Sequence, residues 1–535
     1  MKSASKAMLR IRDLRVGYPQ SGQVVNVIDG LSFELGKGEI VALLGESGSG
    51  KSTVAKALTG LLPASARIGG GTITVGSSAI VDLPLERAPW ESIRGRQIAM
   101  LYQDAQQALN PMLTIQAHFR ESLLYHRLAS AAEVQDVSVK LLRSLNFSEP
   151  LDILARYPFQ LSGGMCQRIC LALALCLKPA VLIADEPTSA LDTVSQKEVL
   201  DLLKTMQAQH GLTVLLISHD IAVANAISDR VIVLNQGALV EDGDTRTVLT
   251  RPRSDYTRGL LASRTQISEA VRESEQPLPR EPLLEILRLD KIFDRKKQVL
   301  HAVDLTLHRA EIVGILGQSG CGKSTLARCI AGLELPSGGR ILYRGAEIGG
   351  LRGKSRREMC KQIQLVFQDA RASLNPSRTA LELVQEPLRY LRIGNKKERE
   401  KLGKFFLDEV GLSGDVQRRR PPQLSTGQCQ RIAIARALVL QPQVLVCDEA
   451  VSALDMNVQA QILALLRRLQ QQYEFAVIMI SHDIRVLRSF CHNIAVMNKG
   501  RFCEILQADA LLDASKQPYT QLLLKCAGDM EIGLD

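Results

Sequence analysis

The chain has 535 residues, enough for two to four domains, and its 46% hydrophobic and 23% charged residues are ordinary for a folded protein. No uninterrupted apolar run approaches about 18 residues, and no apolar stretch follows the lysines of the N-terminus. We therefore expect neither a transmembrane helix nor a signal peptide. The formal net charge of +10 is compatible with nucleic acid, an anionic membrane surface, or solubility alone.

The eleven cysteines include no CxxC pair and no Cys/His cluster at zinc spacing, which favours reduced thiols in a cytosol. Cys166, Cys170 and Cys176 fall within one predicted helix. We interpret them as small apolar residues that pack a helix face rather than as a metal site. The densest basic run, at 418–420, is interpreted as a solvated face.

Near the N-terminus, the sequence predicts a buried strand at 39–44, a glycine loop GESGSGKS at 45–52, and a helix that follows. Glycines let the backbone wrap a phosphate, and the N–H groups of the loop and helix donate to it. Lys51 adds a positive charge, and the Ser52 hydroxyl reaches Mg²⁺. This pattern predicts a nucleotide site.

The same order returns in the second half, with a strand at 311–316 and the loop GQSGCGKS at 317–324. The offset between the halves is 272 residues from Lys51 to Lys323 and 263 from His219 to His482. A repeat of this length indicates a duplicated domain. We predict domains at 1–264 and 284–535, joined by a polar, proline-bearing linker at 265–283.

An acidic pair ends a short apolar strand in each half, in VLIADE at 181–186 and VLVCDE at 444–449. Asp185 and Asp448 are predicted to hold the Mg²⁺ shell, and Glu186 and Glu449 to activate water against the terminal phosphate. Solvent-exposed acids at a strand end would explain one copy alone. They do not explain two copies that each accompany a phosphate loop.

Two further motifs also occur twice. Ser-His-Asp follows an apolar strand in each half, so His219 and His482 are interpreted as contacts to the terminal phosphate rather than as packing residues. LSGGMCQR at 161–168 and LSTGQCQR at 424–431 each open a helix with a serine and small residues. Such a turn is an ordinary N-cap when it stands alone, and in a repeat it predicts a second anion site.

Taken in order, these motifs resemble the ATP-binding-cassette ATPases, with two cassettes fused over nearly the whole chain. The resemblance implies an α/β fold of two tandem P-loop nucleotide-binding domains, each with a mixed-sheet catalytic core and a helical subdomain. It implies ATP and Mg²⁺ as ligands, and hydrolysis coupled to transmembrane transport, the reaction of a translocase.

That family closes its cassettes head to tail. The first site would then join Gly45–Ser52 with Ser425–Gln428, and the second would join Gly317–Ser324 with Ser162–Met165. Gln103 and Gln368 match the glutamine that touches Mg²⁺, Asp192 and Asp455 match the interface aspartate, and Tyr18 and Phe293 match an aromatic stacked on adenine, although either ring could be simple core packing.

The expected catalytic residues are Glu186, Glu449, His219 and His482, and the expected metal ligands are Ser52, Gln103, Asp185, Ser324, Gln368 and Asp448. The expected nucleotide contacts are Tyr18, Gly45, Glu46, Ser47, Gly48, Ser49, Gly50, Lys51, Ser52, Thr53, Ser162, Gly163 and Gly164, and Phe293, Gly317, Gln318, Ser319, Gly320, Cys321, Gly322, Lys323, Ser324, Thr325, Ser425, Gly427 and Gln428.

Two positions distinguish the halves. Thr426 replaces the first glycine of the second signature, so we expect the first site to be weakened but not lost. Cys321 lies inside the second phosphate loop, where a helix N-terminus is expected to lower its pKa. Thiol alkylation is therefore predicted to block nucleotide binding at that loop, with protection by ATP.

The segments at 104–111 and 369–376, and the tails at 255–261 and 518–524, resemble the peptide/nickel importer branch. That branch imports peptides, nickel or metal-opine chelates. It works with two integral-membrane permease subunits and an extracytoplasmic binding protein, at the cytoplasmic face of the bacterial inner membrane. We place permease contacts at about 115–157 and 378–418, and no nucleic-acid partner is expected. Cysteines do not cluster beyond either tail, so no iron-sulfur cluster is predicted.

Two rivals stay open. A twin-cassette translation-factor ATPase acting on ribosomes would suit the basic charge, but such proteins carry a long, charged helical linker, whereas this one is short and contains Pro277 and Pro279. An exporter is also compatible, because the cassettes do not encode direction. The branch-specific tails favour import, and the transported molecule is not encoded in this chain.

Overall fold

The computed structural model describes residues 7–20, 23–76, 78–82, 90–189, 191–269, 281–293, 297–452 and 454–529. The chain divides after Ala262 into two compact units, and the second unit runs from Ser263 to Ala527. The predicted linker at 265–283 lies largely outside the described residues. Its first residues continue α11 (Asp255–Glu269), and its last begin β11 (Pro282–Phe293). The domain boundaries therefore stay a prediction.

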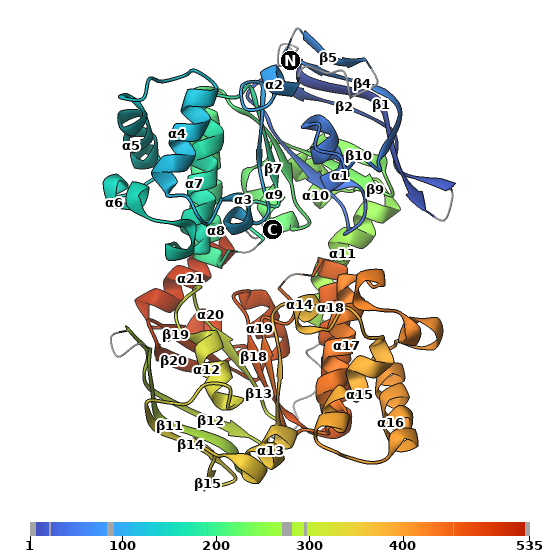
Figure 1. The fold of residues 1–535 in the computed structure, drawn as a ribbon, viewed down its shortest axis with the longest axis vertical. Helices are drawn as coiled ribbons and strands as arrows, with labels where there is room; N and C mark the ends of the chain where they lie inside the picture. Colours follow the sequence, from blue (N-terminus) through green and yellow to red (C-terminus); the bar gives the residue numbers. More distant parts are fainter. Residues whose placement is uncertain are drawn as a thin grey trace. The chain divides into compact units, whose positions relative to one another are not determined.

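The first unit is built on a six-stranded sheet with the order β10-β9-β3-β8-β7-β6 (Figure 1). Its strands are β3 (Ile40–Leu44), β6 (Ile98–Leu101), β7 (Val181–Asp185), β8 (Thr213–Ile217), β9 (Arg230–Asn235) and β10 (Ala238–Asp244). All neighbours pair in parallel except β10 with β9. Every residue of β3, β7 and β8 is buried, as expected for central strands covered on both faces.

A second, antiparallel sheet of the first unit has the order β2-β1-β4-β5. It contains β1 (Ala7–Gln20), β2 (Gln23–Gly36), β4 (Arg67–Val75) and β5 (Ser78–Asp82). One hydrophobic cluster joins this sheet to α1 (Lys51–Leu58) and the parallel sheet, with fully buried contributions from Leu9, Leu35, Val54, Leu43 and Ile183. This core fixes the helix that follows the phosphate loop.

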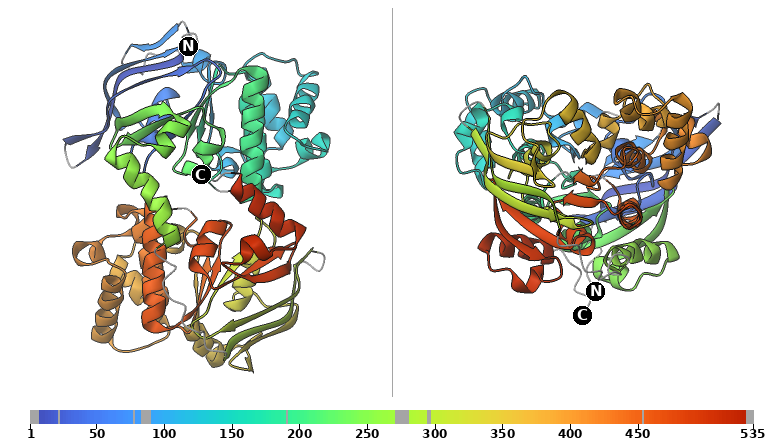
Figure 2. Two further views of the ribbon diagram at one scale, coloured as in Figure 1. Left: turned by 180° about the vertical axis from the view of Figure 1, so that it is seen from behind. Right: turned by 90° about the horizontal axis from the view of Figure 1, so that it is seen from below.

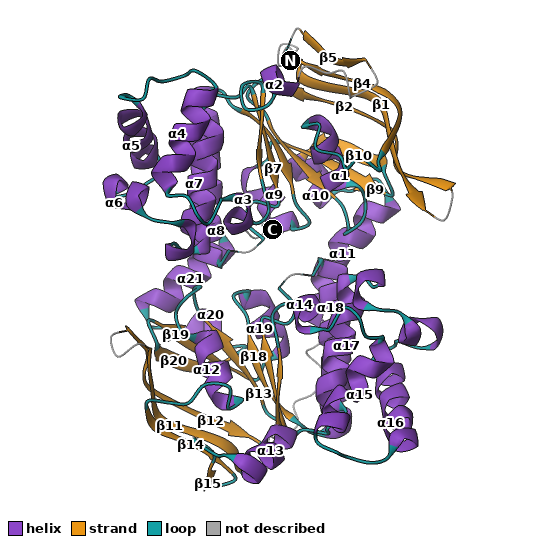
Figure 3. Cartoon of the chain, viewed as in Figure 1, coloured by secondary structure: helices purple, strands orange, loops and turns teal. Residues whose placement is uncertain are grey.

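A group of helices forms the other part of the first unit, beside its sheets in Figures 1 and 3. α4 (Ile115–Tyr125), α5 (Val134–Ser144) and α6 (Pro150–Ala155) pack against one another, and α4 and α5 also pack against α7 (Gly163–Leu175). The remaining helices are α2 (Trp90–Ile93), α3 (Ala105–Ala108), η2 (Pro158–Gln160), α8 (Thr193–His210), α9 (Ile221–Ile227), α10 (Thr245–Thr250) and α11.

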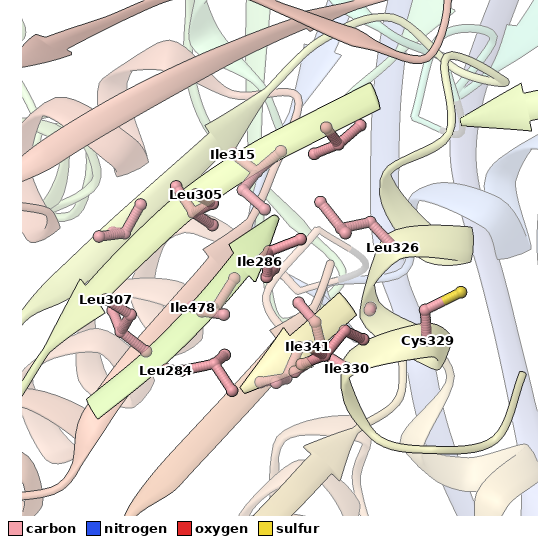
Figure 4. Close-up of a cluster of buried hydrophobic side chains, with 14 of the residues drawn as sticks. Leu284, Ile286, Leu305, Leu307, Ile315, Leu326, Cys329, Ile330, Ile341 and Ile478 are labelled. Atoms are coloured by element: carbon pink, nitrogen blue, oxygen red, sulfur yellow. The ribbon is translucent and has the colours of Figure 1, made fainter. Parts of the chain in front are cut away.

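The second unit repeats this architecture, with parallel-sheet order β16-β17-β18-β13-β19-β20 and antiparallel-sheet order β12-β11-β14-β15. Its strands are β11, β12 (Lys297–His308), β13 (Ile312–Leu316), β14 (Gly338–Tyr343), β15 (Ala346–Glu347), β16 (Ile363–Val366), β17 (Val444–Asp448), β18 (Ala476–Ile480), β19 (Asn493–Asn498) and β20 (Arg501–Gln507). Its core again joins both sheets through one helix, with Ile286, Ile315 and Leu326 among the buried side chains (Figure 4).

The helices of the second unit are α12 (Lys323–Ile330), α13 (Gly353–Gln362), α14 (Ala370–Ser373), α15 (Ala380–Tyr390), α16 (Lys396–Glu409), η3 (Gly414–Arg418), η4 (Pro421–Gln423), α17 (Thr426–Leu438), α18 (Met456–Tyr473), α19 (Ile484–Phe490), α20 (Leu511–Ala514) and α21 (Pro518–Gly528). α15, α16 and α17 pack together as their counterparts do, and Figure 2 (left) shows this group in orange within its unit.

The predicted fold class is confirmed: each unit combines a mixed sheet with a helical part. Cys166 and Cys170 lie on α7 and Cys176 caps its end. Burial raises the pKa of Cys166 to about 11, and those of Cys170 and Cys176 to about 12. The three thiols are thus packed side chains, as predicted. In the described part of the chain, no helix combines the length and the apolar character needed to cross a membrane.

Candidate nucleotide-binding and hydrolysis sites

Each phosphate loop follows a buried central strand and requires glycine at its first position. An ideal Cβ on Gly45 would lie 2.3 Å from a backbone carbonyl oxygen of β9, and one on Gly317 would lie 2.3 Å from the matching oxygen near the end of β19. The glycine before each helix is left-handed, with φ of 104° at Gly50 and 113° at Gly322. Both loops therefore require glycine at these positions, and their backbones form a cradle that fits a phosphate.

The loop lysines are buried and turned back over their own loops. Lys51 Nζ donates to the carbonyl oxygens of Gly45 and Glu46, both at 2.8 Å. Lys323 Nζ makes the same two contacts in the second loop, at 2.7 and 3.0 Å. The charge of each lysine also acts on the acid pair of its own unit. A phosphate bound in the cradle would interact with the same ammonium group.

The loop serines lie next to the first acid of each pair. Ser52 Oγ donates to Asp185 Oδ1 at 3.4 Å, and Ser324 Oγ donates to Asp448 Oδ1 at 3.0 Å. Burial raises the pKa of both aspartates, and the neighbouring glutamate adds to this increase in each case. A hydroxyl beside a carboxylate is a donor set suited to a hard divalent cation, whose charge would favour the ionised aspartate.

The second acid of each pair has an unusual backbone. Glu186 has φ of 46° and Glu449 has φ of 49°, in the left-handed region that glycine favours. The Glu186 N–H donates to the Ile217 carbonyl at 2.9 Å, so hydrogen bonding to the end of β8 holds this conformation. Strain of this kind costs about 1–3 kcal/mol and is concentrated at functional positions. The same conformation occurs at other matched positions of the two units, among them Lys178 and Gln441, so it does not by itself assign a function to the glutamates.

In the first unit, the Glu186 carboxylate accepts from two partners that arise from neighbouring strands. Gln103 Nε2, beyond β6, donates to Oε2 at 2.9 Å, and His219 Nδ1, beyond β8, lies 2.9 Å from Oε1. Because the carboxyl ends of parallel strands meet at one sheet edge, residues about 80 and 30 positions apart in sequence converge there. The structure therefore brings together the predicted glutamine, glutamate and histidine.

The electrostatics of this group favour a charged pair. Burial alone would raise the pKa of Glu186, but the hydrogen bond and charge of His219, with Lys51, leave it below its ordinary value. Burial alone would lower the pKa of His219, but the hydrogen bond and charge of Glu186 leave it raised. Glu186 is thus kept ionised, and an ionised carboxylate can accept a proton from water.

The second unit has the same group with one longer contact. Gln368 Nε2 donates to Glu449 Oε2 at 2.9 Å, whereas His482 Nδ1 lies 3.6 Å from Glu449 Oε1. The pKa directions match those of the first unit. In each residue the hydrogen bond and charge of the partner outweigh the effect of burial, so the pKa of Glu449 is lowered and that of His482 is raised.

The signature serines are exposed helix N-caps. Ser162 Oγ accepts from the Met165 N–H at 3.3 Å at the start of α7, and Ser425 Oγ accepts from the Gln428 N–H at 3.3 Å at the start of α17. Gln428 Oε1 also accepts from the Ser425 N–H at 3.0 Å and completes a capping box. The N-cap interpretation is therefore met within each unit, and the role of these serines at a phosphate of the other cassette stays a prediction.

Thr426 occupies a signature position that has room for a side chain, whereas the next position requires glycine. In the first unit, an ideal Cβ on the matching Gly163 has its nearest contact 3.9 Å away. An ideal Cβ on Gly427 would instead lie 2.6 Å from a methyl carbon of Val458. The threonine thus fits its own unit, while the neighbouring glycine is required by packing.

The two predicted adenine-stacking rings have different surroundings. Tyr18 is partly buried and packs against the core of the first unit. Phe293 is partly buried too, with Lys291 Nζ 4.7 Å from its ring centroid, so a cation covers one face of the ring. Core packing is therefore observed for Tyr18, and adenine stacking stays a prediction for both.

Cys321 is not presented to solvent as a reactive thiol would be. Its side chain is 8% exposed and belongs to the hydrophobic core of the second unit. An alkylating reagent would reach it only if the loop opened. The alkylation hypothesis stays a prediction, but the burial of this thiol argues for slow modification of the folded protein.

The structure adds loop contacts that were not predicted. The hydroxyl oxygen of Tyr256 accepts from the Glu46 N–H at 3.3 Å, and that of Tyr519 accepts from the Gln318 N–H at 3.0 Å. The signal in the sequence was the tail repeat, DYT in one half and PYT in the other, 263 residues apart. Asp192 also has an unpredicted role within its unit, where it caps α8.

Two buried lysine-bearing loops, each with an aspartate and a polarised glutamate at the edge of a parallel sheet, define a P-loop nucleoside triphosphatase with two cassettes. The profile of the ABC transporter family matches residues 28–189 and 300–452. The chain belongs to the ABC transporter family, and its enzymatic activity is ATP hydrolysis coupled to transport. The profile named "Oligopeptide/dipeptide transporter, C-terminal region" matches residues 240–288.

Full-length relatives align with both cassettes. The peptidoglycan transport ATP-binding protein YejF of Agrobacterium fabrum is 38% identical over 537 residues, covering 98% of this chain and 97% of the relative. The glutathione import ATP-binding protein GsiA of Escherichia coli is 36% identical over 557 residues, covering 97% and 89%. A solved dimeric ATP-binding cassette with ADP and phosphate bound is 30% identical, with a TM-score of 0.39, and covers 42% of this chain and 99% of that one.

Proposed function

We propose that this chain is the energy-coupling subunit of an importer for peptide-type substrates. The observation that carries the proposal is the match of residues 240–288 to the oligopeptide/dipeptide transporter region. The names of the two relatives, which refer to peptidoglycan transport and glutathione import, also concern peptide-containing molecules. They give no support to nickel or metal-opine substrates, so peptides are the class proposed.

Hydrolysis is assigned to the acid pairs. Lys51 and the backbone of its loop would bind the phosphates of ATP, and Glu186 would accept the proton of the attacking water. Gln103 and His219 hold the carboxylate of Glu186 in place at 2.9 Å each. Mg²⁺ fits beside Ser52 and Asp185, where it would offset the phosphate charge. The second unit would act in the same way.

We further propose that each phosphate loop is completed by the signature of the other cassette, as the family resemblance implies. Loop 45–52 would then work with Ser425 and Gly427, and loop 317–324 with Ser162 and Gly164. The exposed position of both serines supports this assignment. ATP would act as the ligand that shifts the chain towards the closed arrangement, and hydrolysis would release it.

Permease subunits are the proposed partners, with an extracytoplasmic binding protein that delivers the substrate at an inner membrane. The helical parts of both units expose large apolar side chains within the predicted contact segments. Tyr125 is 69% exposed and Leu151 is 59% exposed in the first unit, and Tyr390 is 76% exposed in the second. Apolar residues exposed in this number support a protein-binding face.

The proposal is tested by purification of the tagged full chain from its native membranes, with and without ATP, followed by identification of the associated proteins. We expect two integral-membrane subunits. A labelled peptide mixture should then accumulate in cells with the intact chain and not in cells with the Glu186→Gln, Glu449→Gln double variant. Co-purification of ribosomes without membrane subunits would overturn the proposal, and ATP-dependent peptide release would show export instead.

A further inference from the structure

The C-terminal tail of each unit reaches the phosphate loop of that unit through one tyrosine. Tyr256, in the first turn of α11, accepts from the Glu46 N–H at 3.3 Å, and Tyr519, in the first turn of α21, accepts from the Gln318 N–H at 3.0 Å. Glu46 and Gln318 are the second residues of their loops. We propose that Tyr256 and Tyr519 are positioning residues that hold each phosphate loop ready for ATP.

The loop residue held by each tyrosine is also a residue contacted by the loop lysine. Lys51 Nζ donates to the Glu46 carbonyl at 2.8 Å, while the Glu46 N–H donates to Tyr256. In the second unit, Lys323 Nζ donates to the Gln318 carbonyl at 3.0 Å. The tyrosine therefore holds the N–H group of a residue whose carbonyl oxygen accepts from the lysine. By holding that residue, it also affects where the phosphate-binding ammonium group lies before ATP binds.

A glutamate on the last strand of each parallel sheet ties the tail to that sheet just ahead of the tyrosine. Glu241, on β10, accepts from the backbone N–H groups of Arg253 at 2.8 Å and Ser254 at 3.2 Å. Glu241 is buried, with 8% of its surface exposed. The start of α11 is thus held by hydrogen bonds to a carboxylate, which are stronger than those between neutral groups.

The second unit repeats this anchor at the same spacing. Glu504, on β20, accepts from Ser515 Oγ at 2.8 Å and from the Lys516 N–H at 3.4 Å. Tyr256 follows Glu241 by 15 residues, and Tyr519 follows Glu504 by 15 residues. In both units, therefore, a glutamate holds the tail and a tyrosine of that tail contacts the phosphate loop. The groups of the tail that bind the glutamate differ between the units. This repetition argues against an incidental contact.

The consequence is that nucleotide affinity depends on the tail. Without the tyrosine hydroxyl, the loop N–H loses this acceptor and the loop gains freedom that ATP binding must remove. A hydrogen bond of ordinary strength contributes about 0.5–1.5 kcal/mol, which corresponds to a roughly two- to tenfold change in affinity. The effect should be confined to the loop that the tyrosine touches.

The test uses the full chain without permeases, so its outcome does not depend on the proposed import function. A Lys323→Ala background restricts binding to the first loop, and a Lys51→Ala background restricts it to the second. Titration with a fluorescent ATP analogue and Mg²⁺ gives Kd in each. We expect Tyr256→Phe to raise Kd roughly two- to tenfold at the first loop only, and Tyr519→Phe to do so at the second only.

Amide exchange gives a second readout that a structural role elsewhere would not change. The peptide containing residues 45–50 should exchange faster in Tyr256→Phe without nucleotide. Tyr343→Phe is the matched control, because its hydroxyl donates to Gln362 Oε1 at 3.2 Å rather than to a phosphate loop. Unchanged Kd and unchanged exchange would overturn the proposal. So would equal weakening at both loops, because that would indicate a global loss of structure.

Discussion

In the first unit, His219 Nδ1 lies 2.9 Å from the Glu186 carboxylate, whereas in the second His482 lies 3.6 Å from Glu449. The serine-to-aspartate contact varies in the opposite sense, 3.4 Å in the first unit and 3.0 Å in the second. The glutamine contact is 2.9 Å in both. The two units thus share one set of groups and differ in the tightness of individual contacts.

The two units differ in residues that neighbour these groups, whereas the groups themselves are the same in both. Ser49 in the first loop is a buried hydroxyl for which the described residues supply no hydrogen-bond partner, and its counterpart is the apolar-packed Cys321. Gly163 in the first signature corresponds to Thr426 in the second. We expect any difference between the two sites to be one of rate and affinity, since both units have the groups that are proposed to carry out hydrolysis.

The largest expected effect comes from the glutamates. Glu186→Gln and Glu449→Gln remove the charged proton acceptor but keep the side-chain size. General-base removal costs about 10²–10⁴-fold, so the double variant should lose ATP hydrolysis by at least about 100-fold. Each single variant should lose the share of the turnover that its own site contributes, which is about half if the two sites are equally active. Phosphate release from the full chain is the measurement.

Glu400→Gln serves as the control for these variants, because Glu400 accepts from the nearby Lys404 at 2.8 Å on an exposed helix face, away from both acid pairs. Its activity should match that of the unaltered chain. Full activity in Glu186→Gln would show that the first site contributes no turnover, and the units would then differ in kind rather than in rate.

The next effect is on stability and concerns the signature glycines. Gly427→Ala places a Cβ 2.6 Å from the β-branched Val458, so it should destabilise the second unit by about 1–3 kcal/mol. Gly164→Ala, the matched change, meets Ser195 at 3.2 Å, and Gly163→Ala meets nothing nearer than 3.9 Å. The loss should fall in that order, with less than about 0.5 kcal/mol for Gly163→Ala. Urea unfolding of each variant gives the ranking, and an equal loss for all three would contradict it.

Most of the groups that the two units share could be predicted from the sequence, because the backbone geometry at their positions requires particular residue types. The left-handed Gly50 and the strand-ending Asp185 can be recognised wherever a phosphate loop and a buried strand follow one another. The fold class followed from the same alternation of strand, loop and helix. The spacing of repeated motifs even assigned Glu186 and His219 to one site, which the order β8-β7 in the sheet explains.

Side-chain contacts between distant segments were not predictable in this way. No local pattern indicates that Tyr256 reaches Glu46, because that contact depends on how α11 leaves the sheet after Glu241. The burial of Cys321 was missed for the same reason: the position of the thiol at a helix N-terminus can be read from the sequence, but the packed core around it cannot. Tertiary packing decided both outcomes.

A third prediction uses pH to compare the two histidine–glutamate pairs. The pKa of His219 is raised in the folded protein, so its pair stabilises the fold fully below the ordinary histidine pKa of about 6.5 and loses that contribution as pH rises through the raised value. The lowered pKa of Glu186 means that its contribution is lost only when pH falls below the ordinary glutamate range.

The destabilisation caused by His219→Gln should therefore be larger near pH 6 than near pH 9, as measured by thermal unfolding of variant and parent at each pH. His482→Gln should show the same sign with a smaller change, because its contact with Glu449 is longer. A destabilisation independent of pH in both variants would show that the histidines act as neutral packing residues.

The smallest expected effect comes from the signature threonine. Thr426→Gly restores the first signature glycine of the second unit and should raise ATP turnover by roughly twofold or less, because one methyl and one hydroxyl are removed from a turn that has room for them. Gly163→Thr, the reciprocal change, should lower turnover by a similar factor without a change in the unfolding midpoint, since the nearest atom to an ideal Cβ there is 3.9 Å away.

In the proposed pairing, Thr426→Gly acts at the loop of Lys51 and should have no effect in a Lys51→Ala background. An increase that persists in that background would assign the threonine to the loop of its own unit and would overturn the exchange of signatures between the cassettes.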